Sequence, residues 1–332
     1  MSKRGIRLGV IGAGHWGRNI VRTCAELDVL AGAADVDAAA RGELHKSYPG
    51  LPLYEKPADL HVDGIDGIIV ASPAELHAEL AIAALTAGKH VFVEKPMALS
   101  LEDGRRMAAL AERERLQLFV GHLMLYHAAV RRLRALIADG LIGRVWHVRS
   151  RRLNLGRLRK HESVWWSFAP HDIAMALAIM GEEPVLATAA QAGWLSARIP
   201  DTAYANFQFS NGRSAHIEVG WLDPQRTARL DVFGTEGVLT FESFGEPFRL
   251  TLCLGGARPD DQGVLKTWRG ESQEIPVEPA DPLRQEILAF LTSIRFGIPA
   301  ETDAKEGLAV LRALTMADEA SARSPAHLEA LA

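Results

Sequence analysis

The sequence predicts an α/β domain with a parallel, doubly wound sheet, followed by an α+β domain with an open-faced, mainly antiparallel sheet. Up to residue 122, short apolar strands alternate with helices, which is typical of parallel βαβ units. The first strand stops in glycines that open a helix. Beyond residue 122, one strand-like run follows another, with tight turns between them. We therefore expect one domain at residues 1–122 and a second at residues 123–332.

The elements of the first domain follow from local patterns. Apolar residues recur at helical spacing after the glycine turn, and Gly88 is placed to end a later helix. Ser100 and Asp103 form a variant of the capping box at a helix start. Strands are expected at residues 6–14, 29–36, 67–72, 89–96 and 116–122, and helices at 15–27, 74–88 and 100–115.

The second domain begins with an amphipathic helix at residues 127–140. Asn211-Gly212 lies between two apolar runs, which is a hairpin signal. Two helical stretches are expected between Pro282 and Ser321, within the same domain. Strands are expected at residues 144–153, 184–193, 202–211, 213–222, 229–237 and 237–243.

Composition and charge exclude several classes of protein. Hydrophobic residues are 48% and charged residues 23% of the chain, which is typical of a globular protein. The net charge of −4 argues against a nucleic-acid binder. Cys24 and Cys253 form no CxxC pair, so we expect no disulfide framework. No signal peptide and no membrane-length apolar run are visible, so we expect a cytoplasmic enzyme without a membrane partner.

A dinucleotide-binding motif opens the chain. The GxGxxG motif comprises Gly12, Ala13, Gly14, His15, Trp16 and Gly17, and it follows a strand and opens a helix. The glycines allow a tight turn, a close approach of a pyrophosphate and close helix–strand packing, while the helix N-terminus attracts the anion. Asp35 follows Gly14 by 21 positions, where a carboxylate accepts hydrogen bonds from the adenosine ribose. We therefore expect NAD as the cofactor, since this carboxylate repels the 2′-phosphate of NADP.

Two later strand ends add candidate residues. Ser72 ends the third strand and is expected to meet the cofactor, and His77 either contacts the cofactor or lies partly exposed on the following helix. The segment VFVEKPM carries an apolar strand up to Glu94, Lys95 and Pro96. This segment is either an ordinary transition from strand to loop or a strand end that carries catalytic residues. Its place beside the expected cofactor favours Lys95 as a general base for an alcohol.

Four segments carry a resemblance to a known family: GAGHWG, ASPAELH, VFVEKPMALSLEDGRRM and GHLMLYH. They resemble the Gfo/Idh/MocA family of nicotinamide-dependent sugar and cyclitol oxidoreductases. The resemblance covers essentially the whole chain and implies a Rossmann domain and an oligomerising sheet, hence a homotetramer or dimer. It implies that Lys95 reaches the hydroxyl being oxidised, and that Glu94 and Pro96 shape the nicotinamide pocket. In some members the bond before this proline is cis.

The family usually carries an aspartate four residues before a histidine. In SFAPHDIAMAL the histidine position is His171, and Ser167 stands where the aspartate is expected. This departure argues against the simplest glucose or inositol dehydrogenase. Asp172 either compensates in part or points elsewhere, since adjacent residues usually point in different directions. His171 either shares proton transfer with Lys95 or is a structural residue before a helix at residues 172–180.

The segment at residues 152–184 resembles the branch of UDP-N-acetylglucosamine 3-dehydrogenases, whose products a partner aminotransferase converts to 2,3-diamino sugars for lipid A or other surface glycans. A basic stretch in this region consists of Arg149, Arg151, Arg152, Arg157, Arg159 and Lys160. Guanidinium groups bind phosphates bidentately, so this stretch suits a nucleotide-sugar diphosphate. The alternative is a solvated strand face or an oligomer contact.

The resemblance thus implies NAD-dependent oxidation at C3 of UDP-N-acetylglucosamine. The alternatives are another nucleotide-sugar reaction, such as oxidation of UDP-N-acetylglucosaminuronate or reduction of a keto sugar, and a non-catalytic NAD sensor. Neither a metal-binding motif nor a GxSxG elbow is visible. Beside the cofactor residues above, Trp166 is expected to line the nicotinamide pocket. The expected substrate contacts are Lys95, Arg152, Asn154, Arg157, Arg159, His171 and Asp172.

Overall fold

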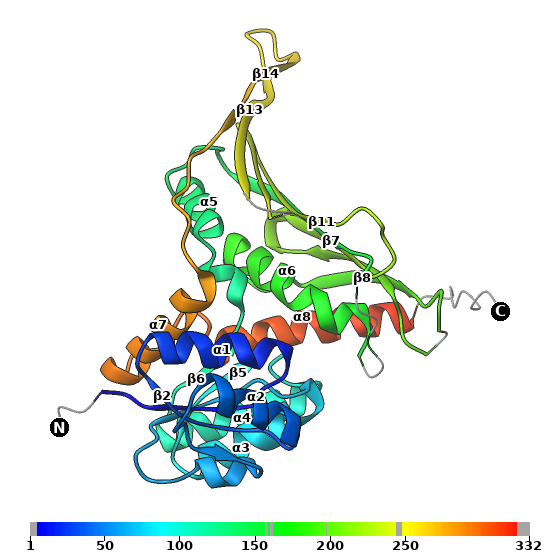
Figure 1. Cartoon of the computed structure of the whole chain (residues 1–332). Coiled ribbons are helices and arrows are strands. Elements are labelled where there is room, and N and C mark those ends of the chain that lie inside the picture. Colours follow the sequence, from blue (N-terminus) through cyan, green and yellow to red (C-terminus); the bar gives the residue numbers. More distant parts are fainter. Residues whose placement is uncertain (1–4, 157–158, 160–161, 197, 244–247, 324–332) are drawn as a thin grey trace. The chain divides into compact units, whose positions relative to one another are not determined.

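The computed structural model describes residues 5–156, 159, 162–196, 198–243 and 248–323. The chain forms two compact units, coloured along the sequence in Figure 1. The first unit comprises residues 1–123 and 281–311, and the second comprises residues 124–280 and 312–332. The sequence had placed everything after residue 122 in the second domain, whereas residues 281–311 belong to the first unit.

The first unit is built on a six-stranded sheet in the order β3-β2-β1-β4-β5-β6, and every pair in it is parallel. The order reverses between β1 and β4, so right-handed crossovers place α1 and α2 on one face of the sheet and α3 and α4 on the other. This is the predicted Rossmann arrangement. Its elements are β1 (Leu8–Ile11), α1 (His15–Glu26), β2 (Leu30–Ala34), α2 (Ala38–Ser47), β3 (Leu53–Tyr54), η1 (Pro57–Leu60), β4 (Gly67–Val70), η2 (Ala74–Leu76), α3 (His77–Thr86), β5 (His90–Glu94), α4 (Leu101–Glu114) and β6 (Leu118–Gly121).

Helix α7 (Pro282–Phe296) completes the core of the first unit. Its buried residue Phe290 lies 5.8 Å from the ring of Phe92 in β5 and 5.6 Å from that of Phe119 in β6. The rings of Phe92 and Phe119 stack at 4.8 Å. Helix α7 therefore buries its apolar stripe on the first sheet, which explains why this late segment does not belong to the second unit.

The second unit contains an eight-stranded sheet in the order β14-β13-β12-β11-β7-β10-β9-β8, drawn from green to yellow in Figure 1. The pair β7–β10 is parallel and the other pairs are antiparallel, as predicted. Its elements are η3 (Leu123–Tyr126), α5 (Ala128–Ala138), β7 (Val145–Leu153), α6 (Val164–Met180), β8 (Leu186–Ala192), β9 (Thr202–Gln208), η4 (Ser210–Gly212), β10 (Ser214–Gly220), β11 (Thr227–Gly234), β12 (Gly237–Glu242), β13 (Arg249–Pro259) and β14 (Leu265–Glu274). Helix α8 (Ala304–Ala322) contributes residues to both units.

Two features of the second unit differ from the prediction. Strands β13 and β14 were not expected. Strand β14 is exposed along nearly its whole length and has no alternation of apolar and polar residues. Helix α6 begins at Val164 rather than at residue 172, and the side chain of Ser163 caps it by accepting from the amide of Trp166. The helix continues through Pro170, so His171 lies inside it and is not a helix cap.

The aromatic contact between α7 and the first sheet predicts a large effect of one substitution. Phe290→Ala leaves a cavity beside Phe92 and Phe119, so we expect it to lower the free energy of unfolding by about 3–5 kcal/mol. Phe296→Ala, on the same helix but with 66% of the side chain exposed, should change it by less than about 0.5 kcal/mol. Urea unfolding of both variants measures this, and equal effects would contradict the assignment of α7 to this core.

Candidate functional site

The glycine motif forms an open cradle between β1 and α1. Gly12 has φ of +96°, and a Cβ there would lie 2.6 Å from the carbonyl oxygen of Ala71. A Cβ on Gly17 would lie 2.0 Å from the carbonyl oxygen of Gly12, so both positions require glycine. A Cβ on Gly14 would meet nothing within 4 Å. Gly14 is therefore not needed for packing inside the protein, and its lack of a side chain leaves room for a ligand.

Asp35 fixes this cradle from the end of β2. Its carboxylate accepts hydrogen bonds from the amides of Ala13, at 2.6 Å, and Asp37, at 2.8 Å. Helix α1 has no capping side chain and no acidic residue in its first turn. The helix N-terminus therefore keeps its positive dipole end available for a phosphate. These residues fit a dinucleotide, with Asp35 held where a ribose hydroxyl would donate to it.

His77 connects two strand ends instead of facing solvent. Its side chain is buried, with Nδ1 2.8 Å from the carbonyl oxygen of Pro96 and Nε2 3.0 Å from that of Ser72. Ser72 follows β4, and Pro96 follows β5. The ring thus holds together the two loops in which the sequence predicted cofactor contacts. Its position favours an indirect role, through the backbone of Ser72, over a direct contact with the cofactor.

Glu94 is the last residue of β5, and Lys95 follows it. The carboxylate of Glu94 accepts a hydrogen bond from Trp16 Nε1 at 2.5 Å and one from the amide of Lys95 at 3.3 Å. Burial raises the pKa of Glu94, although the Trp16 hydrogen bond and the positive charge of Lys95 act in the opposite direction. Lys95 is half-buried, and the bond between Lys95 and Pro96 is cis. Trp16 therefore joins the glycine motif to the strand end that carries the lysine.

The second unit holds a separate group of predicted residues on β7 and α6. The guanidinium of Arg152 donates to the buried carboxylate of Asp172, from Nε at 2.7 Å and from Nη2 at 3.1 Å. Ser150 Oγ donates to the same carboxylate at 2.5 Å. The carboxylate of Asp172 therefore orients Arg152, and its burial makes it a support for Arg152 rather than an exposed ligand group.

The residues around His171 follow the helical spacing of α6. His171 is half-buried, and Ser167, four residues earlier on the same face, is buried. The indole of Trp166 donates to Asp318 at 2.7 Å, and Gln191 donates to the other oxygen of that carboxylate at 2.5 Å. Trp166 is therefore anchored inside the second unit by its polar edge, and its neighbour Trp165 is part of the core.

The described residues of the basic stretch are divided between the two faces of the sheet and the segment after β7. Successive residues of β7 point to opposite faces of the sheet, so Arg149 donates to Asp231 in β11, whereas Arg152 donates to Asp172 in α6. Arg159 is exposed and pairs with Glu162 at 3.4 Å. Asn154 is half-buried after β7. The predicted substrate residue Arg157, with Lys160, lies outside the described residues.

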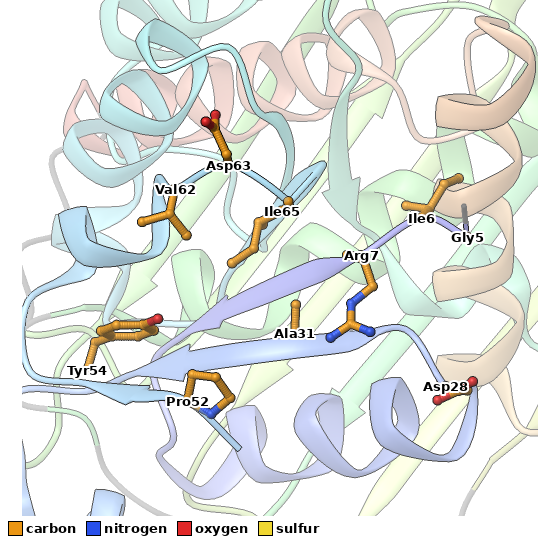
Figure 2. Close-up of a pocket in the computed structure, with 11 residues that line it drawn as sticks. Gly5, Ile6, Arg7, Asp28, Ala31, Pro52, Tyr54, Val62, Asp63 and Ile65 are labelled. Carbon is orange, nitrogen blue, oxygen red and sulfur yellow. The ribbon is translucent and has the colours of Figure 1, made fainter. Parts of the chain in front are cut away.

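A hollow of about 560 Å³ lies at the end of the first sheet away from the glycine motif (Figure 2). Its lining includes Arg7 before β1, Asp28 before β2 and Pro52 before β3, so it adjoins the amino ends of the strands. Open α/β sheets bind their ligands at the carboxyl ends. This hollow is therefore not the candidate cofactor site.

Within the part of the chain that the structure describes, no group of three or more His, Cys, Asp or Glu side chains is arranged to hold a metal ion. Among the described helices, none has the length and apolar character needed to span a membrane.

Comparison with known families decides the class of the protein. Residues 6–122 match the model described as oxidoreductase family, NAD-binding Rossmann fold. Residues 130–240 match the Gfo/Idh/MocA C-terminal domain. The chain belongs to the Gfo/Idh/MocA family of oxidoreductases. Its first unit is accordingly an NAD-binding domain, as the glycine cradle and Asp35 predicted.

Individual relatives share this family over most of their length. The chain is 25% identical over 314 residues to UDP-N-acetylglucosamine 3-dehydrogenase from Acidithiobacillus ferrooxidans, covering 93% of this chain and 95% of that protein. The solved structure of that enzyme superimposes with a TM-score of 0.83 at 24% identity, covering 96% and 97% of the two chains. A 1,5-anhydro-D-fructose reductase from Ensifer adhaerens is 30% identical over 268 residues, covering 75% of this chain and 77% of that protein.

Three side chains at this end of the first sheet were not expected from the sequence. His122, at the end of β6, and Glu306, in the first turn of α8, form a pair at 2.6 Å. Glu286 is a buried carboxyl group on α7. A signal for Glu286 is present in the sequence, because it occupies a core position of the stripe formed by Leu283, Ile287 and Phe290.

The open space at Gly14 predicts that a side chain added there lowers the affinity for the cofactor without changing the stability of the protein. Gly14→Ala adds a methyl group that contacts no protein atom but lies where the backbone meets a pyrophosphate. We expect NAD affinity to fall at least about 10-fold while the melting temperature without NAD stays within about 2 °C of the parent protein. Fluorescence titration and thermal unfolding measure the two quantities. Unchanged affinity in a folded variant would contradict the placement of the dinucleotide.

The two carbonyl contacts of His77 predict a structural effect. His77→Ala removes the partner of two carbonyl oxygens, so we expect the free energy of unfolding to fall by about 1–3 kcal/mol. His45→Ala, at an exposed position on α2, should change it by less than about 0.5 kcal/mol. Chemical unfolding without cofactor compares the two, and a His77 variant as stable as the His45 variant would rule out this structural role.

Proposed function

We propose that the protein oxidises the C3 hydroxyl of UDP-N-acetylglucosamine to the 3-keto sugar, with NAD as the oxidant. A downstream aminotransferase would convert this ketone to a 2,3-diamino sugar used in lipid A or another surface glycan. The observation that carries this proposal is the end-to-end similarity to UDP-N-acetylglucosamine 3-dehydrogenase, combined with a lysine at the end of β5. The family alone supports an NAD-dependent sugar oxidoreductase.

In the proposed reaction NAD, when bound, would supply the acceptor for the hydride that leaves C3. Lys95 takes the hydroxyl proton, which leaves a carbonyl group at C3. Glu94 holds the backbone of Lys95 through the amide hydrogen bond, and Trp16 fixes Glu94 in turn. The lysine is thus carried by a rigid strand end, which suits a group that must approach one hydroxyl in a defined direction.

The second unit supplies the groups that we propose for substrate recognition. Arg152 uses two nitrogens for Asp172, and Nη1 has no acceptor among the described residues, so it is the nitrogen assigned to a diphosphate oxygen. Asn154 is assigned to the sugar or the uracil, and Arg157 and Arg159 to the phosphates. His171 is assigned to the reacting sugar, where it orients the hydroxyl or shares its proton. Ser167 stands where the family usually carries an aspartate, so this assignment of His171 does not include the usual Asp–His arrangement.

A second candidate function is the reduction of a sugar ketone. The similarity to 1,5-anhydro-D-fructose reductase favours it, because the same lysine could return a proton to the carbonyl oxygen. For either reaction we propose a cytoplasmic enzyme that assembles as a homotetramer or dimer through the open sheet face.

The direct test is a panel of UDP-sugars incubated with the purified protein and NAD, followed by the absorbance of reduced nicotinamide. We expect UDP-N-acetylglucosamine to give the largest signal, with a glutamate-dependent sugar aminotransferase added to remove the ketone and draw the reaction forward. UDP-N-acetylglucosaminuronate and UDP-glucose serve as matched substrates. A flat trace with all sugars, despite NAD binding, would favour a non-catalytic sensor.

Lys95 is the proposed base, so its substitution is the most direct single test of the proposed proton transfer. Lys95→Ala should lower kcat by about 100-fold to 10,000-fold, while NAD affinity stays within about threefold, since the glycine cradle and Asp35 are untouched. Lys46→Ala, which removes an exposed lysine of the same unit, should leave both quantities unchanged. Steady-state kinetics and NAD titration measure them. Near-normal turnover of the Lys95 variant would contradict its role.

A further inference from the structure

A buried acidic cluster lies at the carboxyl ends of β5 and β6, beside Lys95. We define it as Glu94, Glu286 and Glu306, together with His122. Glu286 is fully buried, Glu94 is 7% exposed, and the side chain of Glu306 is 18% exposed. All four residues belong to the first unit. None of the dinucleotide contacts derived above uses Glu286 or Glu306.

The same periodicity that builds the aromatic core builds this cluster. Glu94 lies two residues beyond Phe92 on β5, so it points to the same face of the sheet. Glu286 lies one helical turn from Phe290 on α7, which packs on that face. Gly121 pairs with Glu94 across β5 and β6, and a Cβ there would come within 3.1 Å of the Glu94 carboxylate. The missing side chain leaves room for the carboxyl groups.

The hydrogen bonds within the cluster are unevenly distributed. Glu94 accepts from Trp16 and from the amide of Lys95. Glu306 pairs with His122 Nδ1 at 2.6 Å. Both carboxyl oxygens of Glu286 have no hydrogen-bond partner among the described residues. A buried carboxylate without a donor is far more costly than a buried carboxylic acid.

Charge balance in the cluster also favours a neutral Glu286. The charged neighbours that act on Glu286 are Glu94 from β5 and Glu306 from α8, and both raise the pKa of Glu286 in addition to its burial, which is the largest cause. The groups of opposite sign near Glu94 are Lys95 and His122. Helix α1, which also packs against α7, buries one titratable group, Cys24, whose pKa is raised to about 12 by burial, so it stays a neutral thiol. A third carboxylate beside Glu94 and Glu306 would therefore add a negative charge that Lys95 alone does not balance.

We propose that Glu286 is held as a neutral, protonated acid behind Glu94, and that the loss of its proton lowers the activity at alkaline pH. The proposal rests on the proposed role of Lys95 as the base. An ionised Glu286 would add a buried negative charge behind Glu94. That charge would hold the proton on Lys95 as an ammonium and weaken the packing of α7 on the strand ends.

The direction of the stability effect follows from the raised pKa of Glu286. In the unfolded chain this glutamate ionises near its ordinary pKa of about 4.3. The folded protein keeps the proton above that pH, so the stability contributed by Glu286 is complete below about pH 4.3 and is lost progressively as the pH rises toward the folded value. A neutral residue at this position carries no such loss.

The test compares Glu286→Gln with Ser293→Ala, which changes a second buried polar residue of α7 without a change in charge. Thermal unfolding without cofactor should show the Gln variant gaining on the parent protein between about pH 5 and pH 8, by at least about 3 °C over that range. The Ser293 variant should show an offset that does not change with pH. Near neutral pH, kcat and KM of the Gln variant should stay within about twofold of the parent values.

The activity profile gives the second readout. The alkaline decline of kcat/KM in the parent protein should move up by about one pH unit or more in the Gln variant and stay in place in the Ser293 variant. If the amide variant fails to fold, Glu286→Met, also neutral, carries the same expectations.

Several results would overturn the proposal. They are a stability difference between Glu286→Gln and the parent protein that does not change with pH, an alkaline decline of kcat/KM that stays in place in this variant, or a loss of its activity near neutral pH. The stability readout does not involve catalysis. If Lys95→Ala keeps normal turnover while the stability offset still grows with pH, the proposed base is wrong but the neutral Glu286 stands. If Lys95→Ala loses turnover but the stability offset of the Gln variant does not change with pH, the inference about Glu286 fails and the proposed base stands.

Discussion

The buried carboxylate of Glu94 at the end of β5 constrains the rest of the first unit. A carboxylate at this depth needs hydrogen-bond donors and space, and neighbouring elements provide both. Helix α1 contributes the indole of Trp16, the next peptide contributes the amide of Lys95, and β6 contributes the space at Gly121. The glycine motif and the lysine are far apart in the sequence, and Trp16 links them directly through Glu94. The position of Lys95 therefore depends on the same packing that forms the cofactor cradle.

The sequence predicted the first unit well because its features are local. The spacing of Gly12, Gly14 and Gly17 reflects two close backbone approaches and one open position, and each of these is a property of one turn. The strand end at Glu94 and Lys95 was visible for the same reason. The assignment of α7 to the first unit was not visible in the sequence, because the contact of Phe290 with Phe92 and Phe119 joins segments separated by about half the chain. A helical pattern alone does not say which sheet the helix covers.

Site residues were harder to predict than elements, since their surroundings decide their roles. His77 was expected near the cofactor, yet burial and two carbonyl oxygens make it a link between loops. A run of arginines suggested one phosphate patch, but the alternation along β7 separates Arg149 from Arg152, and each pairs with a different aspartate. Glu286 shows the converse. The sequence analysis did not single it out, because only the folded structure shows that both of its carboxyl oxygens are buried without a partner among the described residues.

We propose that the chemistry takes place at the strand end of the first unit and that β7 and α6 of the second unit recognise the substrate, with C3 of UDP-N-acetylglucosamine as the reacting carbon. Isotope transfer tests this claim most directly. The enzyme would be mixed with NAD and UDP-N-acetylglucosamine carrying deuterium at C3, and the reduced cofactor analysed by mass spectrometry, with substrate deuterated at C4 as the matched control. The account predicts label in the reduced nicotinamide from the C3 substrate and none from the C4 substrate. Label arriving from C4, or no reduced cofactor from either sugar, would contradict it.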